Sequence, residues 1–466
     1  MSVPNRADLK AKLKELECPF TWDISAADIE DLDNIPEKLQ DRVKFCHRRY
    51  QATYLNILAF VSHMKGNNED ALEFLRKAEA VLKADKQVSA AFLVTYANFA
   101  WVHYYCGNLN DVNIFLCKLE EICKDVPGSS QYSCSLPLIY GEKGWTFLRL
   151  GATYYKRAKE NFQKAVEGET ENVSFNMGYG VILYRLEEMV TDERLKSKVS
   201  EAIPQLKKAL VLDPSNAEVM VLLAIKLQQK NPAEALKLIE NALKLSPDVP
   251  HVTRYVAKYL RAEKCPSKSL QILGESLERT PTSSFLYHQI GLCHKQQLID
   301  MCKEERESYT LSPMKKNKIK ECIHNFSKAV ELKPTNIYAQ VNLAEAYGDN
   351  QQLYEAEKIF TELLHDGVLR ESDKQHVCTA YGQFLMYKRK DEHRAVAEFK
   401  SAYKIKIQSR DRKKAGEKLQ RIAGKWQRNR QTGEASKILA FLRAEDIRYD
   451  DTADLSAAFE RGMKFK

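Results

Sequence analysis

The sequence predicts an all-α fold in which pairs of antiparallel helices stack into a superhelix. A proline-containing turn recurs at Pro214, Pro247, Pro281 and Pro334, at intervals of 33, 34 and 53 residues. A small residue stands five positions before each of these prolines, namely Ala209, Ala242, Ser276 and Ala329. Small residues let two helices cross closely, and proline ends the helix that precedes it. This is the tetratricopeptide pattern, and such arrays bind other molecules along one surface.

The same pairing can be followed outward from these central repeats. Glycines at Gly66 and Gly107, each followed by asparagine, separate the helices of the first two pairs. Polar inserts around 187–200 and 299–320 lengthen two pairs, and the second insert explains the interval of 53 residues. Beyond residue 410 the pattern loosens into three or four further helices that end near residue 466. The nine predicted pairs cover 54–82, 94–126, 141–173, 175–216, 217–248, 249–282, 284–336, 337–368 and 372–405.

Composition favours one continuous helical array over separate globular domains. The 466 residues include only 14 Pro and 18 Gly, and no Ser/Gly/Pro-rich linker divides them. The 11 cysteines form no Cys-x-x-Cys pair, so neither a disulfide framework nor a zinc site is expected. No charged-then-apolar leader opens the chain, and its most apolar stretch, 90–102, is too short and polar to cross a bilayer. A cytosolic protein without cofactor, metal or membrane partner is expected.

Positive charge is concentrated near the C-terminus. Residues 388–430 hold 16 Lys and Arg against 5 Asp and Glu, a local excess of +11, whereas the whole chain carries +9. Helical spacing places cations on one face of this region and apolar residues on another. The cationic face is either a solvated surface or a track for a polyanion, which would bind with strong salt dependence. Its members are Lys414, Lys418, Arg421, Lys425 and Arg428.

Three predicted first helices carry cations, and two of these also carry aromatic residues. Trp145 and Arg149 share a face, with Tyr155 about three turns on. Arg254, Lys258 and Arg261 form a row beside Tyr255, and Lys38, Arg42 and Arg49 form another near the N-terminus. Guanidinium groups hold phosphate oxygens and aromatic rings stack on bases, so these helices suit single-stranded nucleic acid.

Each of these residues also has a purely structural interpretation. Trp145 and Leu148 match packing positions of the tetratricopeptide consensus, Arg185 is by default a charge at a helix end, and His288 a hydrogen-bonded interior histidine. Single residues therefore do not decide between a binding groove and a packed array.

Sequence runs outside the generic repeat consensus resemble the interferon-induced proteins with tetratricopeptide repeats, and the resemblance covers nearly the whole chain. The runs include Cys18-Pro19-Phe20-Thr21-Trp22, Leu58-Ala59-Phe60-Val61, Asn98-Phe99-Ala100-Trp101, Gly144-Trp145, Tyr184-Arg185-Leu186, Arg254-Tyr255 and His288-Gln289-Ile290-Gly291-Leu292-Cys293.

The resemblance implies an innate-immune RNA sensor of the cytosol that performs no chemistry. Its helical clamp would surround a central basic RNA-binding tunnel that takes the 5′ end of single-stranded RNA. A 5′-triphosphate, or a cap lacking ribose 2′-O-methylation, would be recognised, and the RNA sequestered or its translation blocked. The segments implied are 1–53, N-terminal helices that cap the tunnel; 54–248 and 249–405, the N-terminal and middle repeats; and 406–466, basic C-terminal helical repeats. Family paralogues and translation factors are possible partners.

Residue by residue, the resemblance assigns two sets of RNA contacts. The 5′-phosphate set is Lys38, Arg42, Arg149, Arg185 and Arg254. The base and ribose set is Trp145, Tyr155, Tyr255, Phe285, His288, Gln289 and Tyr338.

Departures from the family pattern shape the expected ligand. The family's N-terminal phosphate contacts, usually Arg or Thr followed by Gln, are Lys38 and Arg42 here, which raises the local charge. Cys46 and Arg48 stand at small cap-pocket positions that are commonly Leu and Thr, and an arginine would crowd or reshape a cap site. We therefore expect triphosphate to be favoured over cap. Glu218 replaces a tyrosine and should disfavour phosphate nearby. The self-association motif becomes 459–463, Phe-Glu-Arg-Gly-Met, whose glycine costs roughly 1 kcal/mol against alanine in a helix.

Two other classes of function have less support in the sequence. A peptide-binding scaffold would need a Lys/Asn clamp on adjacent first helices, which the sequence does not clearly offer, although the fold permits it. An enzyme is less supported still, because the chain has no Gly-x-x-x-x-Gly-Lys-Ser/Thr, His-Glu-x-x-His or Gly-x-Ser-x-Gly motif.

Overall fold

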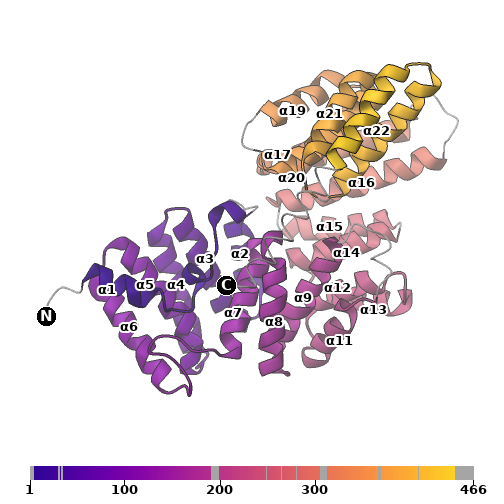
Figure 1. Cartoon of the computed structure of the whole chain (residues 1–466). Helices are drawn as coiled ribbons and strands as arrows, with labels where there is room; N and C mark the ends of the chain where they lie inside the picture. Colours follow the sequence, from indigo (N-terminus) through magenta and orange to yellow (C-terminus); the bar gives the residue numbers. More distant parts are fainter. Residues whose placement is uncertain are drawn as a thin grey trace. The chain divides into compact units, whose positions relative to one another are not determined.

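The computed structural model is built from helices (Figure 1). It describes residues 5–446 except 30–31, 33–34, 190–198, 248, 264, 280, 305–311, 366–368 and 408, and these described residues contain no β-strand. Two compact units divide the chain, Met1–Tyr255 and Val256–Lys466.

The first unit begins with α1 (Arg6–Leu13) and α2 (Ile35–Phe45) and continues as helix pairs. Short 3₁₀ turns at Pro19–Thr21, Ala26–Asp28, Arg48–Tyr50, Ser89–Phe92 and Ala152–Tyr154 link its elements. The pairs are α3 (Gln51–Met64) with α4 (Asn68–Ala84), α5 (Leu93–Cys106) with α6 (Leu109–Lys124), α7 (Pro137–Leu150) with α8 (Tyr155–Gly168), α9 (Val173–Met189) with α11 (Ala202–Leu212), and α12 (Ala217–Leu227) with α13 (Pro232–Leu245).

Helix α14 (Pro250–Ala262) starts in the first unit and ends in the second. The second unit continues with α15 (Pro266–Arg279), α16 (Ser284–Glu304), α17 (Pro313–Leu332), α18 (Ile337–Asp349), α19 (Leu353–His365), α20 (Glu371–Phe384), a π-helical turn (Leu385–Arg389), α21 (Glu392–Lys404) and α22 (Arg410–Arg428). Residues 432–446 form one more helix.

The nine predicted helix pairs are confirmed, and the prolines act as expected. Helices α11, α13, α15 and α17 each end two residues before Pro214, Pro247, Pro281 and Pro334. The insert around 299–320 appears as extra turns at the end of α16 and the start of α17, which have 21 and 20 residues. Beyond residue 410 the described part of the chain holds two helices. The remaining expected helices, the segment 459–463 and most of the 187–200 insert lie outside the described residues.

Glycines of first helices receive phenylalanine rings of second helices. Phe162 on α8 is fully buried and packs on Gly144 of α7 and Gly178 of α9, while its ring meets Trp145 edge-on with centroids 5.3 Å apart. Phe326 packs on Gly291 in the same way. A Cβ at these glycines would overlap the ring. Each glycine therefore sets how closely neighbouring helices approach.

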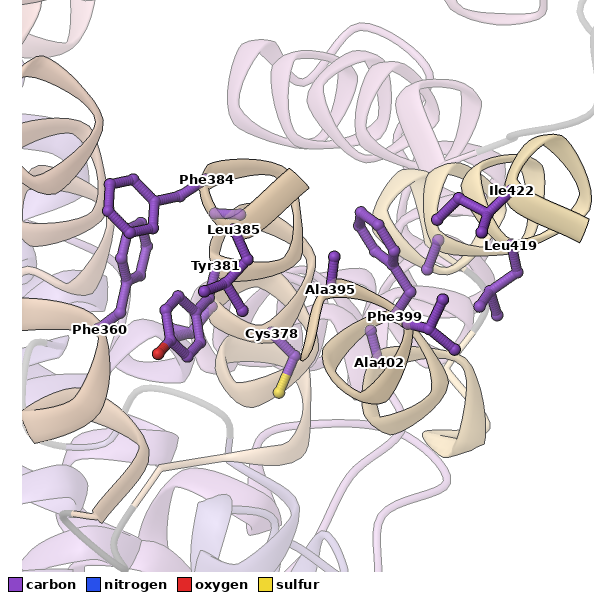
Figure 2. Close-up of a cluster of buried hydrophobic side chains, with 14 of the residues drawn as sticks. Phe360, Cys378, Tyr381, Phe384, Leu385, Ala395, Phe399, Ala402, Leu419 and Ile422 are labelled. Carbon is purple, nitrogen blue, oxygen red and sulfur yellow. The ribbon is translucent and has the colours of Figure 1, made fainter. Parts of the chain in front are cut away.

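The core of the second unit follows the same rule (Figure 2). Phe399 of α21 packs on Gly382 of α20, and its ring joins a buried cluster with Leu419 and Ile422 of α22. Phe360 of α19 stacks on Tyr381 of α20 with ring centroids 5.1 Å apart. Burial of this kind is the main source of stability in helical arrays.

Replacing Gly178 with alanine should destabilise the protein, because its Cβ would collide with Phe162 in a packed core. Overpacking of this kind costs about 1–3 kcal/mol, so the apparent melting temperature should fall clearly. Gly424→Ala in α22 is the control, since a Cβ there has no neighbour within 4 Å and alanine favours helix by up to about 1 kcal/mol. Equal melting temperatures for Gly178→Ala and the parent chain would contradict this account.

Candidate nucleic-acid interface

Arg149 of α7 lies among aromatic rings. Its guanidinium carbon is 5.0 Å from the ring centroid of Trp145 and 5.3 Å from that of Tyr54, and it donates a hydrogen bond to the Tyr54 hydroxyl at 3.0 Å. Its Nε is buried and has no hydrogen-bond partner. Buried donors are normally satisfied, so this Nε is an exception within the packed region around Arg149.

Trp145 itself lies in the core. Only 2% of its surface is exposed, and its indole N–H donates to Ser174 at 2.9 Å. One ring face is covered by Arg149, and Phe162 meets the ring edge-on. The packing interpretation of Trp145 therefore describes its place in this structure, and a direct base contact stays a prediction that requires Arg149 to move.

A second cationic and aromatic group surrounds Tyr255 on α14. The guanidinium carbons of Arg185 and Arg254 lie 5.7 and 5.9 Å from its ring centroid, and Tyr184 meets the ring edge-on at 6.1 Å. The Tyr255 ring is buried, and its hydroxyl has no hydrogen-bond partner. Tyr155, at the start of α8, is half-buried. Arg185 is thus part of an aromatic cluster rather than a plain helix-end charge.

Arg42 of α2 is bound by Glu218 of α12. Both terminal nitrogens of its guanidinium bind the carboxylate, one of them at 2.8 Å, and only 12% and 5% of the two side chains are exposed. His251 approaches the same carboxylate at 3.6 Å. Arg42 is therefore already paired with a carboxylate, whereas Lys38, one turn earlier on α2, is exposed.

The ionisation of this group follows from its burial and its charges. Burial alone would raise the pKa of Glu218, but the charge of Arg42 holds that pKa well below its usual range. Burial and the charge of Arg42 lower the pKa of His251 to about 3. Near neutral pH the group is an ion pair beside a neutral imidazole.

Arg48 stands at one of the two cap-pocket positions that the resemblance names, and it is paired with an acid. Its side chain is 55% exposed and binds Asp85 at 2.7 Å, while Cys46 is half-buried. The guanidinium is thus bound by an acid at the α4 C-terminus, and an effect of Arg48 on a cap site stays a prediction.

The remaining base-contact candidates lie in the second unit, on α16 and α18. Gln289 is buried and accepts a hydrogen bond from Arg261 at 2.9 Å, and His288 lies 3.1 Å from the amide nitrogen of Asn342. Phe285 is a partly buried member of the core around Leu273. The structure therefore brings polar and aromatic candidates onto neighbouring helices of this unit.

Tyr338 of α18 is half exposed and packs on His376, with ring centroids 4.6 Å apart. The imidazole Nδ1 is 2.9 Å from Asp411, which orients the ring. The sequence did not indicate that Asn342 and His376 lie beside these candidates, Asn342 next to His288 and His376 against Tyr338. Asn342 could have been found, because it lies one helical turn after Tyr338 on the same face.

Helix α22 has the predicted amphipathic character. Leu419, Ile422, Ala423 and Trp426 are buried, which confirms the apolar face. On the other face Lys414, Arg421 and Arg428 are exposed. Lys418 donates to the Tyr387 hydroxyl at 2.7 Å, and Lys425 pairs with Glu392. Three of the five cations therefore point to solvent, and two contact neighbouring elements.

Glu142 is a buried acid one turn before Trp145 on α7. It accepts a hydrogen bond from Thr53 at 2.6 Å through one oxygen, and its other oxygen is buried without a partner. Burial raises the pKa of Glu142 to about 7, although the Thr53 hydrogen bond opposes the shift. The first unit thus holds an acid that titrates near neutral pH.

Within the part of the chain that the structure describes, no helix is long and apolar enough to cross a membrane, and no group of three or more His, Cys, Asp or Glu side chains could hold a metal ion. These helices and side chains define a tetratricopeptide-repeat protein whose first helices carry partly buried arginines among aromatic rings.

Relatives extend over almost the whole chain. Antiviral innate immune response effector IFIT1 of Macaca fascicularis is 34% identical, covering 98% of each chain. Interferon-induced protein with tetratricopeptide repeats 2 of Homo sapiens is 32% identical and covers 100% of this chain and 97% of its own. No protein-family model matches. The chain belongs to the family of interferon-induced proteins with tetratricopeptide repeats, as its sequence motifs indicated.

Solved structures agree with this assignment. The human IFIT1 dimer with m7Gppp-AAAA superposes with a TM-score of 0.77 at 33% identity, covering 98% of this chain and 99% of that chain. The human IFIT1 dimer with PPP-AAAA gives 0.75 at 32% identity, covering 96% and 97%. The predicted superhelix of tetratricopeptide repeats is confirmed.

Removing the buried acid should change how stability depends on pH. Because the pKa of Glu142 is raised in the folded state, its favourable contribution is complete below the unfolded pKa near 4.5 and is lost as pH rises through about 7. Glu142→Gln should therefore stabilise the protein at pH 8 relative to pH 5, by about 2 kcal/mol. Melting temperatures of both chains from pH 5 to 8 measure this difference.

Thr53→Val provides a matched second variant, since it removes the hydrogen bond that lowers the Glu142 pKa. The pKa of Glu142 should then rise further, so the stability of this variant should keep falling above pH 7, where that of the parent chain levels off. Parallel melting curves for the parent chain and Glu142→Gln would contradict the assignment.

Proposed function

We propose that this protein is a cytosolic antiviral RNA-binding protein of innate immunity that holds the 5′ end of single-stranded foreign RNA. It favours a 5′-triphosphate and accepts a cap that lacks ribose 2′-O-methylation. Binding sequesters the RNA or blocks its translation, and no catalytic step is involved. Family paralogues and translation factors are the protein partners we infer.

The observation that carries this proposal is the set of unpartnered polar atoms beside the arginines. Arg149 Nε and Tyr255 Oη are both buried without hydrogen-bond partners, and Arg185 lies against the Tyr255 ring. Phosphate oxygens accept hydrogen bonds from guanidinium and hydroxyl groups alike. An anionic ligand at this place would satisfy donors that the folded protein leaves open.

Discrimination between 5′ ends follows from electrostatics. A triphosphate brings several negative charges to Arg149 and Arg185, which are half-buried, and to Arg254, which is exposed. Partial burial weakens solvent screening, so the first two arginines contribute most. A 5′-hydroxyl brings no such charge to these arginines. The phosphates are held by these arginines with Lys38, and Arg42 contributes only where it is not bound to Glu218.

Bases behind the phosphates stack without strict sequence selection. Tyr155 and Phe285 supply half-buried rings, and Tyr338 supplies a half-exposed ring. His288 and Gln289 contact base edges or ribose. The rings of Trp145 and Tyr255 are buried, so they contact the RNA only when the arginines beside them move. The exposed cations of α22 then follow the outgoing strand.

Support for this ligand class comes from the relatives. Solved structures of human IFIT1 hold PPP-AAAA and m7Gppp-AAAA, and IFIT1 is named an antiviral innate immune response effector. Those chains are about as long as this one and share about a third of its residues.

The direct test compares one RNA sequence with four 5′ ends: triphosphate, cap without ribose methylation, 2′-O-methylated cap and hydroxyl. Strong preference for triphosphate or the unmethylated cap supports the proposal. Equal weak binding to all four would reduce the site to a charged surface and favour a protein-interaction scaffold.

Arg185→Ala should weaken binding of 5′-triphosphate RNA much more than binding of 5′-hydroxyl RNA, by about tenfold or more, because a charge-assisted contact is worth about 1.5–3 kcal/mol. Fluorescence anisotropy with the two RNAs measures the ratio. Arg157→Ala is the control, since that arginine is bound to the carbonyls of Trp22 and Asp23. An equal loss for both RNAs would make Arg185 a general backbone contact.

Reversing two charges of α22, with Lys418→Glu and Arg421→Glu, should lower affinity for long RNA and flatten its salt dependence. Counterion release makes the slope of affinity against salt proportional to the phosphates neutralised. The control variant is Lys358→Glu in α19 with Lys124→Glu in α6, two other exposed cations whose reversal changes the net charge by the same amount. If the RNA affinity and its salt dependence are both unchanged, this face of α22 is only a solvated surface.

A further inference from the structure

The Glu218 carboxylate binds the Arg42 guanidinium in the way that a phosphate would. A carboxylate and a phosphate both present two oxygens to the fork of a guanidinium, and here both terminal nitrogens of Arg42 bind both oxygens of Glu218. The pair joins α2 to α12, and its two residues are 176 positions apart in sequence. Only 5% of the Glu218 side chain is exposed, so the carboxylate is held inside the protein next to Arg42.

The same carboxylate acts on the other cations of the first unit. Burial raises the pKa of Glu218, and the charge of Arg42 lowers it most; Arg149 also lowers it, to a smaller extent, so the Glu218 carboxylate and Arg149 interact electrostatically. Arg149 in turn carries the unpartnered Nε. The fixed negative charge of Glu218 therefore lies near the cations that face the proposed ligand. Because the interior screens charges poorly, this carboxylate repels the phosphates of the RNA.

We propose that Glu218 is a specificity-determining residue: an internal anion that neutralises Arg42, removes it from phosphate binding and reduces the preference of the site for highly charged 5′ ends. This inference rests on the proposed function. The site then distinguishes a triphosphate from a less charged 5′ end less steeply than its number of arginines suggests. Arg42 serves mainly to keep the Glu218 charge buried.

A double-mutant cycle of Glu218 and Arg42 tests this proposal. Each variant is measured with one RNA sequence that carries a 5′-triphosphate, a 5′-monophosphate or a 5′-hydroxyl. Glu218→Gln keeps the shape of the side chain and frees Arg42, so affinity for triphosphate RNA relative to hydroxyl RNA should rise about tenfold. Arg42→Gln leaves the acid facing the phosphates, so the ratio should fall. The double variant should lie between the two single variants, and the monophosphate should show the same order with smaller changes.

Stability provides a second measurement, since a buried arginine without its partner is costly. Glu218→Gln should melt at a lower temperature than the parent chain, and triphosphate RNA should raise its melting temperature more than that of the parent chain. Glu73→Gln, which breaks the exposed pair with Lys77 on α4, is the matched control and should change neither quantity.

The possible outcomes separate this inference from the proposed function. If the parent chain binds all three RNAs equally and Arg185→Ala has no selective effect, the proposed function fails. If the parent chain prefers triphosphate but Glu218→Gln lowers or leaves unchanged that preference, the inference fails, and Glu218 instead positions Arg42 as a direct phosphate ligand. Equal losses of preference in both single variants and in the double variant would also overturn the inference.

Discussion

The packing of Phe162 between Gly144 and Gly178 is the contact on which the candidate site depends. This ring sets the approach of α7 and α9 to α8, and it also meets Trp145 edge-on. Arg149 follows Trp145 by one turn on α7, and Arg185 lies further along α9. Because the glycines have no side chain, the two arginine-bearing helices can both pack closely against Phe162 of α8. The positions of the candidate site residues therefore depend on the spacing that the core imposes.

Much of the fold could be predicted from the sequence because its signals are local. Pro214, Pro247, Pro281 and Pro334 end helices by removing a donor, and the small residues five positions earlier, three alanines and one serine, are buried. The extra turns of α16 and α17 were visible as a long interval between prolines. The C-terminal amphipathic helix was visible as a separation of cations from Leu419, Ile422 and Trp426.

The candidate site was predictable in its residue types but not in its pairings. Arg42 and Glu218 are far apart in sequence, and nothing local to either indicates that they bind each other. Trp145 could not be assigned from the sequence for a different reason. A tryptophan that packs in the core and one that stacks on an RNA base have the same local sequence pattern. Burial and the Ser174 hydrogen bond place it in the core. Charge compensation across a fold requires three-dimensional contacts, and one sequence does not reveal them.

Helices α16 and α17 show how a stacked array can change length. At about 1.5 Å per residue, a helix of some 20 residues is about 30 Å long, whereas neighbours of 13 residues such as α18 and α19 are about 20 Å long. The extra turns of both helices lie toward their shared connection, while α17 still ends two residues before Pro334 like the second helices of the other central pairs. A repeat can thus lengthen at its hairpin end and keep the turn that joins it to the next pair, and the added turns bring buried residues of their own, such as Leu298 and Ile319.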